Sequence, residues 1–171
     1  MNGGDAMALI VEVIIGIIIA FIIYEMIRRM IVQRATRMVR RSAEDDTDVA
    51  VKAALQRLVN NDVLSEDECV LQPTETVADV WGRGVMAFEY TMPSGIDTER
   101  RLPEIEAAFN EALASFSADH QVKAVVAGPA FVVSDIWVYE GHLHVDVANL
   151  MNESTVEYLK DLKKLNDPAV K

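Results

Sequence analysis

An uninterrupted apolar run near the N-terminus is the strongest pattern in the chain. Residues 6–27, "AMALIVEVIIGIIIAFIIYEMI", contain nine isoleucines and two charged residues, Glu12 and Glu25. About 20 apolar residues in a helix span the hydrocarbon core of a bilayer, which is roughly 30 Å thick. Nine isoleucines contribute on the order of −4 kcal/mol to insertion, which exceeds the cost of about +3 kcal/mol for one central charge. The pattern predicts a short tail over 1–6 and a single transmembrane helix over 7–27.

One side of this predicted helix carries small and polar residues at intervals of four. Glu12, Gly16, Ala20 and Tyr24 share it, and Gly16 with Ala20 forms a small-xxx-small pair. Such pairs let a second helix approach closely, and a carboxyl group beside them can bind a polar group of that helix. We expect packing against other membrane subunits or a second copy. The alternative is that Glu12 only reaches to the outer surface and Gly16 has no special role.

A basic helix is predicted directly after the apolar run, over residues 28–42. Its arginines are Arg28, Arg29, Arg34, Arg37, Arg40 and Arg41, and residues 28–41 contain no acid. Arginines concentrate on the cytoplasmic side of membrane helices. We therefore expect a single-pass protein of the cell membrane with its N-terminus outside and its C-terminal domain in the cytoplasm. Each arginine near anionic lipid headgroups contributes about 1 kcal/mol, so the arginines are expected to contact lipid.

The remaining chain alternates between helical and strand-like periodicity, which predicts an α+β fold. We expect an acidic helix and linker over 43–76, with a helix over 47–60, and then an α+β domain over 77–171. That domain is expected to hold an antiparallel sheet with helices packed on one face, for which a ferredoxin-like arrangement lacking its last strand is one form. Its predicted elements are strands at 85–92, 122–128, 131–139 and 142–150, a helix over 103–116 and a helix that begins after a capping box at Ser154.

Charge separates the two halves of the chain. From residue 42 onward, 24 acidic residues face 10 basic ones. Phosphate would be repelled by such a domain, so nucleic acid is not expected as a partner. A nucleic-acid contact of the arginine segment ranks lower than lipid contact, because membrane topology already accounts for those arginines. Cys69 is the only cysteine, so no intrachain disulfide can form.

Candidate chemistry is confined to "GHLHVDV", residues 141–147. His142, His144 and Asp146 alternate with apolar residues, as on one face of a strand. If Glu140-Gly141 is a two-residue hairpin turn, Tyr139 lies opposite His142, Trp137 opposite His144, and Asp135 opposite Asp146. This register collects aliphatic residues on the other face, namely Ile136, Val138, Leu143, Val145 and Val147, together with Ser134. That separation favours it over a longer loop, which would mix the two faces.

Several interpretations of this face remain open at this stage. Exposed tryptophan and tyrosine are enriched in binding sites, so Trp137, Tyr139, His142 and His144 form a candidate partner-binding face. The same face can also be a solvent face or be covered by the helix over 47–60. His142, His144 and Asp146 can also ligate a metal ion, which makes a membrane-anchored metal-dependent enzyme the alternative function. The His-x-His-x-Asp run resembles the opening of the metallo-β-lactamase metal motif over five residues only, and Val147 stands where that motif has a further histidine.

The function expected from these patterns is that of a single-pass, membrane-anchored interaction module. It would act as a subunit or adaptor of a membrane protein assembly. We assign no catalytic residue, metal or cofactor from the sequence.

Overall fold

The structure is a computed structural model that describes the backbone of residues 3–72, 75–76 and 84–166. Side chains are described for these residues except 3–10, 32–37, 75–76 and 166. The chain divides into two compact units, Met1–Val39 and Arg40–Lys171. Helix α1, Gly3–Asn60, enters both units, and each unit is described here by itself.

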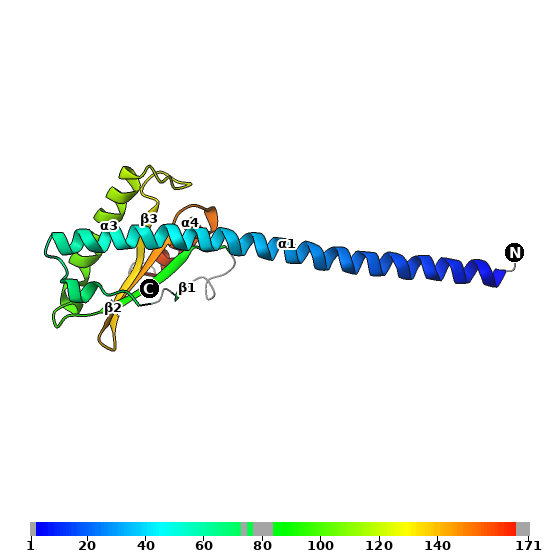
Figure 1. The fold of residues 1–171 in the computed structure, drawn as a ribbon, viewed down its shortest axis with the longest axis horizontal. Coiled ribbons are helices and arrows are strands. Elements are labelled where there is room, and N and C mark those ends of the chain that lie inside the picture. The colour runs from blue at the N-terminus through cyan, green and yellow to red at the C-terminus, as the bar shows by residue number, and fades with distance from the viewer. Residues whose placement is uncertain (1–2, 73–74, 77–83, 167–171) are drawn as a thin grey trace. The chain divides into compact units, whose positions relative to one another are not determined.

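The first unit is helical throughout its described part, where helices were predicted over 7–27 and 28–42 (Figure 1). Between Val11 and Ile31 its large apolar side chains are exposed, with 47% to 63% of each accessible. Glu25 pairs with Arg28 at 3.0 Å and lies 3.8 Å from Arg29. Among the side chains that are described, no helix carries a stretch long and apolar enough to cross a membrane. The predicted span of 7–27 begins with residues 7–10, whose side chains lie outside the described part.

The second unit is an α+β domain, as predicted. Its sheet has the strand order β1-β2-β4-β3 with antiparallel neighbours, and β4 therefore lies between the two other long strands (Figure 1). The strands are β1 (Glu75–Thr76), β2 (Ala87–Pro93), β3 (Phe131–Tyr139) and β4 (His142–Asn149). The helical elements are η1 (Glu66–Cys69), η2 (Glu99–Arg101), α3 (Leu102–Asp119) and α4 (Glu153–Asn166), besides the end of α1.

One face of the sheet holds the main core. The last turns of α1 and the apolar stripe of α3 pack against alternate residues of β2, β4 and β3. The stripe of α3 falls at the spacing predicted from sequence, with Ile105, Phe109 and Leu113 fully buried. Phe88, Tyr90 and Met92 of β2 face the same core. Burying one such side chain contributes about 1.5–3 kcal/mol, so this layer dominates the stability of the unit.

Helices cover both faces of the sheet, which corrects the prediction of helices on one face. Helix α4 packs on the second face through Val156 and Tyr158, in a smaller cluster with Ala87 and Ala148. Ala87 and Ala148 lie opposite each other in the sheet, and their small side chains leave room for the helix. The predicted ferredoxin-like form had its helices on one face of the sheet, and the placement of α4 departs from it.

The acidic stretch predicted as a linker or helix start is part of α1 and of the core. Ala43, Thr47, Ala50 and Val51 are all at most 1% exposed. The side chain of Asn149 donates to the Ala43 carbonyl and to Thr47 Oγ1, at 3.3 and 3.2 Å. The buried stripe of this helix therefore begins at Ala43, one turn before the predicted start of the helix at residue 47.

The strand predicted over 122–128 is absent. These residues form turns and irregular structure, and Val125 and Val126 are exposed. Gly128 has a φ of +128°, which a strand does not contain, and Pro129 follows it without an amide hydrogen. The apolar run is therefore a loop in front of β3. The strand predicted over 85–92 is confirmed as β2.

Truncating Leu58 tests whether the end of α1 belongs to the domain core. Leu58 is 1% exposed and packs in the main cluster. Leu58→Ala should lower the free energy of unfolding by about 2–5 kcal/mol, because it leaves a cavity. Urea unfolding of the full chain in detergent, followed by tryptophan fluorescence, measures this. The exposed Lys52→Ala on the same helix should change stability by less than about 0.5 kcal/mol; equal midpoints for the two variants would contradict the assignment.

Candidate functional site

The candidate site lies on the part of the second sheet face toward the β3–β4 turn. Side chains at alternate positions of β2, β4 and β3 point to this face, and their register gives three rows across the sheet. The rows are Glu89–Asp146–Asp135, Thr91–His144–Trp137 and Pro93–His142–Tyr139. The three pairings predicted between β3 and β4 are confirmed.

The turn that fixes this register is the predicted two-residue turn. Glu140 and Gly141 have φ values of +49° and +77°. Two left-handed residues are typical of the type I′ turn, whose twist matches that of paired strands. Glycine adopts this conformation without strain, whereas glutamate rarely does. The backbone amide of Ser94 donates to the Gly141 carbonyl at 3.1 Å, which ties the turn to the end of β2.

His144 is held in place by polar and aromatic contacts. Its Nδ1 lies 2.7 Å from Glu89 Oε1 and 3.3 Å from Thr91 Oγ1. Its ring stacks on Trp137 with the centroids 5.0 Å apart and the planes at 9°. These contacts fix the orientation of the imidazole, so His144 serves as the rigid centre of the face.

The outer row is more accessible. Tyr139 is 60% exposed, and its ring lies tilted 6.5 Å from that of His144. His142 Nδ1 lies 3.2 Å from the Glu140 carbonyl. The structure thus brings Trp137, Tyr139, His142 and His144 onto one surface, with the aromatic side chains of β3 beside the histidines of β4.

A row of three carboxyl groups borders the aromatic residues. Asp146 is central and only 6% exposed, and its Oδ1 has no hydrogen-bond partner among the described residues. Burial, followed by the charges of Glu89 and Asp135, raises the pKa of Asp146 to about 7. Burial is also the main cause of the raised pKa of Tyr158, with a hydrogen bond to Ser134 opposing it and the charges of Asp146 and Asp135 adding to it. Asp146 therefore holds a proton in conditions where an exposed aspartate is ionised.

The described residues contain no cluster of side chains that would support a metal site. Among the described residues, no three His, Cys, Asp or Glu side chains are grouped so that they could hold one ion. The contacts of His144 go to Glu89 and Thr91, and those of His142 to a backbone carbonyl. The arrangement supplies stacking surfaces, hydrogen-bonding groups and negative charge, which are means of binding.

The helix that lies beside this face, and two of the residues on the face, differ from those expected from the sequence. The helix over 47–60 was one candidate cover for this face, but it packs on the opposite face of the sheet. The helix beside the site is α4, through Tyr158. Glu89 and Thr91 are part of the site that the sequence analysis missed. Their position beside β4 depends on a pairing of residues more than 50 apart, which no local pattern reveals.

The residues predicted for membrane contacts all lie on α1. Glu12, Gly16, Ala20 and Tyr24 are exposed at intervals of four. A Cβ atom added to Gly16 would meet no atom within 4 Å. Among the arginines, Arg28, Arg29 and Arg41 are exposed and Arg40 is half-buried, while the side chains of Arg34 and Arg37 lie outside the described part.

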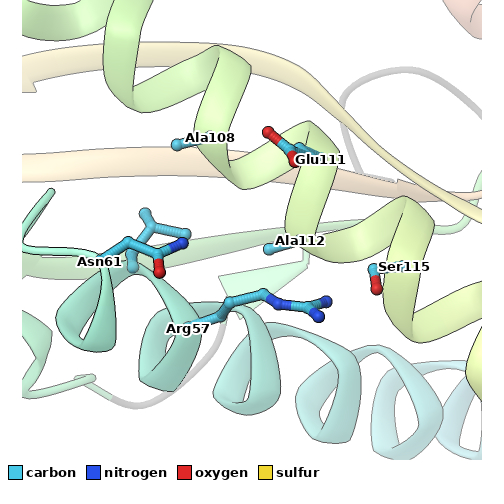
Figure 2. Close-up of a pocket in the computed structure, with 7 residues that line it drawn as sticks. Arg57, Asn61, Ala108, Glu111, Ala112 and Ser115 are labelled. Atoms are coloured by element: carbon cyan, nitrogen blue, oxygen red, sulfur yellow. The ribbon is translucent and has the colours of Figure 1, made fainter.

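A separate small pocket lies between α1 and α3, on the other side of the domain. Its volume is about 130 Å³, and Figure 2 shows Arg57 and Asn61 on the α1 side and Glu111 and Ser115 on the α3 side. Ala108 and Ala112 also line it. Short side chains where two helices pack account for this hollow, so we place the candidate site on the sheet face.

Comparison with known protein families, curated proteins and solved structures returns no match to this chain.

Replacing Asp146 tests the electrostatics of the carboxyl row. The pKa of Asp146 in the folded state, about 7, lies above the ordinary value of 3.8, so the folded state binds a proton more tightly than the unfolded state. The resulting stabilisation is complete below about pH 4 and is lost as the pH rises through 7, by up to about 1.4 kcal/mol per pH unit. Asp146→Asn removes this contribution to the pH dependence.

Urea midpoints of the full chain at pH 5, 6, 7 and 8 measure the effect. The stability of the wild type should fall with rising pH more steeply than that of Asp146→Asn. Asp45→Asn, on the exposed side of α1, is the matched control and should keep the wild-type slope. Parallel curves for the wild type and Asp146→Asn would contradict a raised pKa at this position.

Proposed function

We propose that this protein is a single-pass, membrane-anchored interaction module, acting as a subunit or adaptor of a membrane protein assembly. The observation that carries the proposal is the exposure of apolar side chains all around α1 between Val11 and Ile31. A helix that is apolar on every side is covered by lipid or by other helices. With each large apolar side chain contributing about 1.5–3 kcal/mol on burial, leaving this segment in water is strongly unfavourable.

The charged residues at the end of this segment support a membrane span over residues 7–27. Glu25 would lie near the membrane surface, and its ion pairs with Arg28 and Arg29 reduce the cost of placing a carboxylate there. The remaining arginines of 28–42 would contact anionic headgroups. Arginines concentrate on the cytoplasmic side of membrane helices, so the N-terminal tail would lie outside the cell and the acidic domain in the cytoplasm.

Two surfaces are available for protein partners. In the membrane, the open space at Gly16 would let another helix approach along Glu12, Gly16, Ala20 and Tyr24. In the cytoplasm, Trp137, Tyr139, His142 and His144 would bind a second protein. A rigid aromatic pair beside fixed polar groups is typical of the centre of a binding surface.

Cysteine labelling tests the membrane topology. Burial and the nearby charge of Glu68 raise the pKa of the Cys69 thiol to about 11, so this thiol would react slowly and is better removed by Cys69→Ala. In that background, Asn2→Cys should react with a membrane-impermeant maleimide in intact cells, and the exposed Ala118→Cys only after lysis. The reverse pattern would invert the topology, and release of the protein by alkaline carbonate would contradict membrane insertion.

Bulky substitutions test the helix-packing surface. Gly16→Leu with Ala20→Leu should reduce the recovery of co-purifying membrane subunits, or of a second tagged copy, by about tenfold, because the two leucines prevent close approach of helices. Ile14→Leu with Ile18→Leu lies on another side of the helix and is the matched control. If the Gly16/Ala20 variant recovers as much partner as the Ile14/Ile18 variant, this surface does not pack against another helix.

A further inference from the structure

We infer that the carboxyl row Glu89–Asp146–Asp135 is a binding site for a cationic side chain, an arginine or lysine, on a segment of the cytoplasmic partner. The inference rests on the proposal that this sheet face binds a protein, and it defines the chemistry of that protein. The cation would lie between Glu89 and Asp135, beside the stacked rings of Trp137 and His144.

The first step is the strand register. Glu89 lies directly opposite Asp146, and Asp146 directly opposite Asp135, on three adjacent strands. Side chains in such pairs have Cβ atoms about 4.5–5.5 Å apart, and like charges at that distance are destabilising. The fold thus gathers three acids where each raises the free energy of the others. Glu89 also contacts His144 Nδ1 through its Oε1, at 2.7 Å.

The second step is the state of the central acid. Asp146 is more than nine-tenths buried, and its Oδ1 lacks a partner among the described residues. A buried carboxyl group without a partner costs free energy in either protonation state. The row is therefore electrostatically incomplete in the free chain, and a positive charge placed on its accessible edge, at Asp135 and Glu89, would stabilise it.

The third step is the shape and charge of the surroundings. Asp135 and Tyr139 are exposed at the rim, and the side chain of Glu89 is 26% exposed. Charge complementarity with the acidic domain favours a basic partner. A guanidinium group fits better than an ammonium group, because its planar fork can donate to two carboxylates while its flat side packs along an aromatic residue.

Binding of the cation should release a proton. A positive charge at Glu89 and Asp135 opposes the two charges that, after burial, keep Asp146 protonated. The groups facing Asp146 are Glu89 on β2, Asp135 on β3, His144 on β4 and Tyr158 on α4. Near neutral pH, Asp146 should therefore lose part of its proton when the partner binds, and the affinity should rise with pH.

A peptide-binding experiment on the full chain in a neutral detergent tests the site. The probe is a short synthetic peptide with arginines at alternate positions, compared with the same peptide carrying neutral citrulline. Glu89→Gln with Asp135→Asn should weaken binding of the arginine peptide by about tenfold or more, since both charged acceptors of the guanidinium group are lost. Glu106→Gln with Glu111→Gln removes the same charge from α3 and should change the affinity less than about twofold. Thermal unfolding confirms that each variant is folded.

Calorimetry in two buffers of different ionisation enthalpy measures the proton. Release should be seen with the wild type near pH 7 and be absent with Asp146→Asn. Equal affinity for the citrulline peptide, or an equal loss in the α3 control, would overturn the inference in favour of general attraction to an acidic surface. Proton release that persists in Asp146→Asn would overturn the coupling.

The native partner separates this inference from the proposed function. Capture from native membranes that is lost in Trp137→Ala and also in Glu89→Gln with Asp135→Asn supports both. Capture lost only in Trp137→Ala keeps the partner-binding face and overturns the cation site. Capture unaffected by either variant overturns the binding role of this face itself.

Discussion

The register of β4 between β2 and β3 is the constraint on which the rest of the domain depends. Leu143, Val145 and Val147 face the core, and the residues between them face the candidate site. Because strand side chains alternate, a slip of one residue would place the histidines and Asp146 in the core and the apolar residues outside. Core packing and site geometry are therefore fixed by the same hydrogen bonds, and the turn at Glu140-Gly141 sets them.

Much of this arrangement could be predicted because it is local. The hairpin register follows from alternation on both sides of a two-residue turn, and α3 from an apolar stripe at helical spacing. The position of β2 beside β4 could not be predicted, because it joins residues distant in sequence and many pairings bury equal apolar area. The strand expected at 122–128 had suitable residues, but Gly128 and the pairing of the sheet excluded it.

Helix α1 shows how one element can carry two kinds of hydrophobic pattern. From Ala43 to Leu58 its apolar residues form a stripe that the domain buries, and acidic residues take the other sides. From Val11 to Ile31 the apolar residues surround the helix, and its own unit covers none of them. The acidic stretch after Arg41 has the composition of a boundary between two helices, yet α1 continues through it. The buried side chains of Ala43 and Thr47 show that one small side chain per turn is enough to continue the core.

The carboxyl row lowers the stability of the domain at the same place where the proposed binding surface lies. A buried acid between two others lowers the stability of the domain as the pH rises, whereas an apolar side chain of similar size would not. Asn149, three residues along β4 from Asp146, shows the contrast, since its side-chain NH2 group donates to the Ala43 carbonyl and to Thr47 Oγ1 and thereby fixes α1 on the sheet, while its Oδ1, like that of Asp146, lacks a partner among the described residues. A polar group that joins two elements of the fold has a structural reason for its burial, while an acid that faces two further acids gains one only when a positive charge arrives.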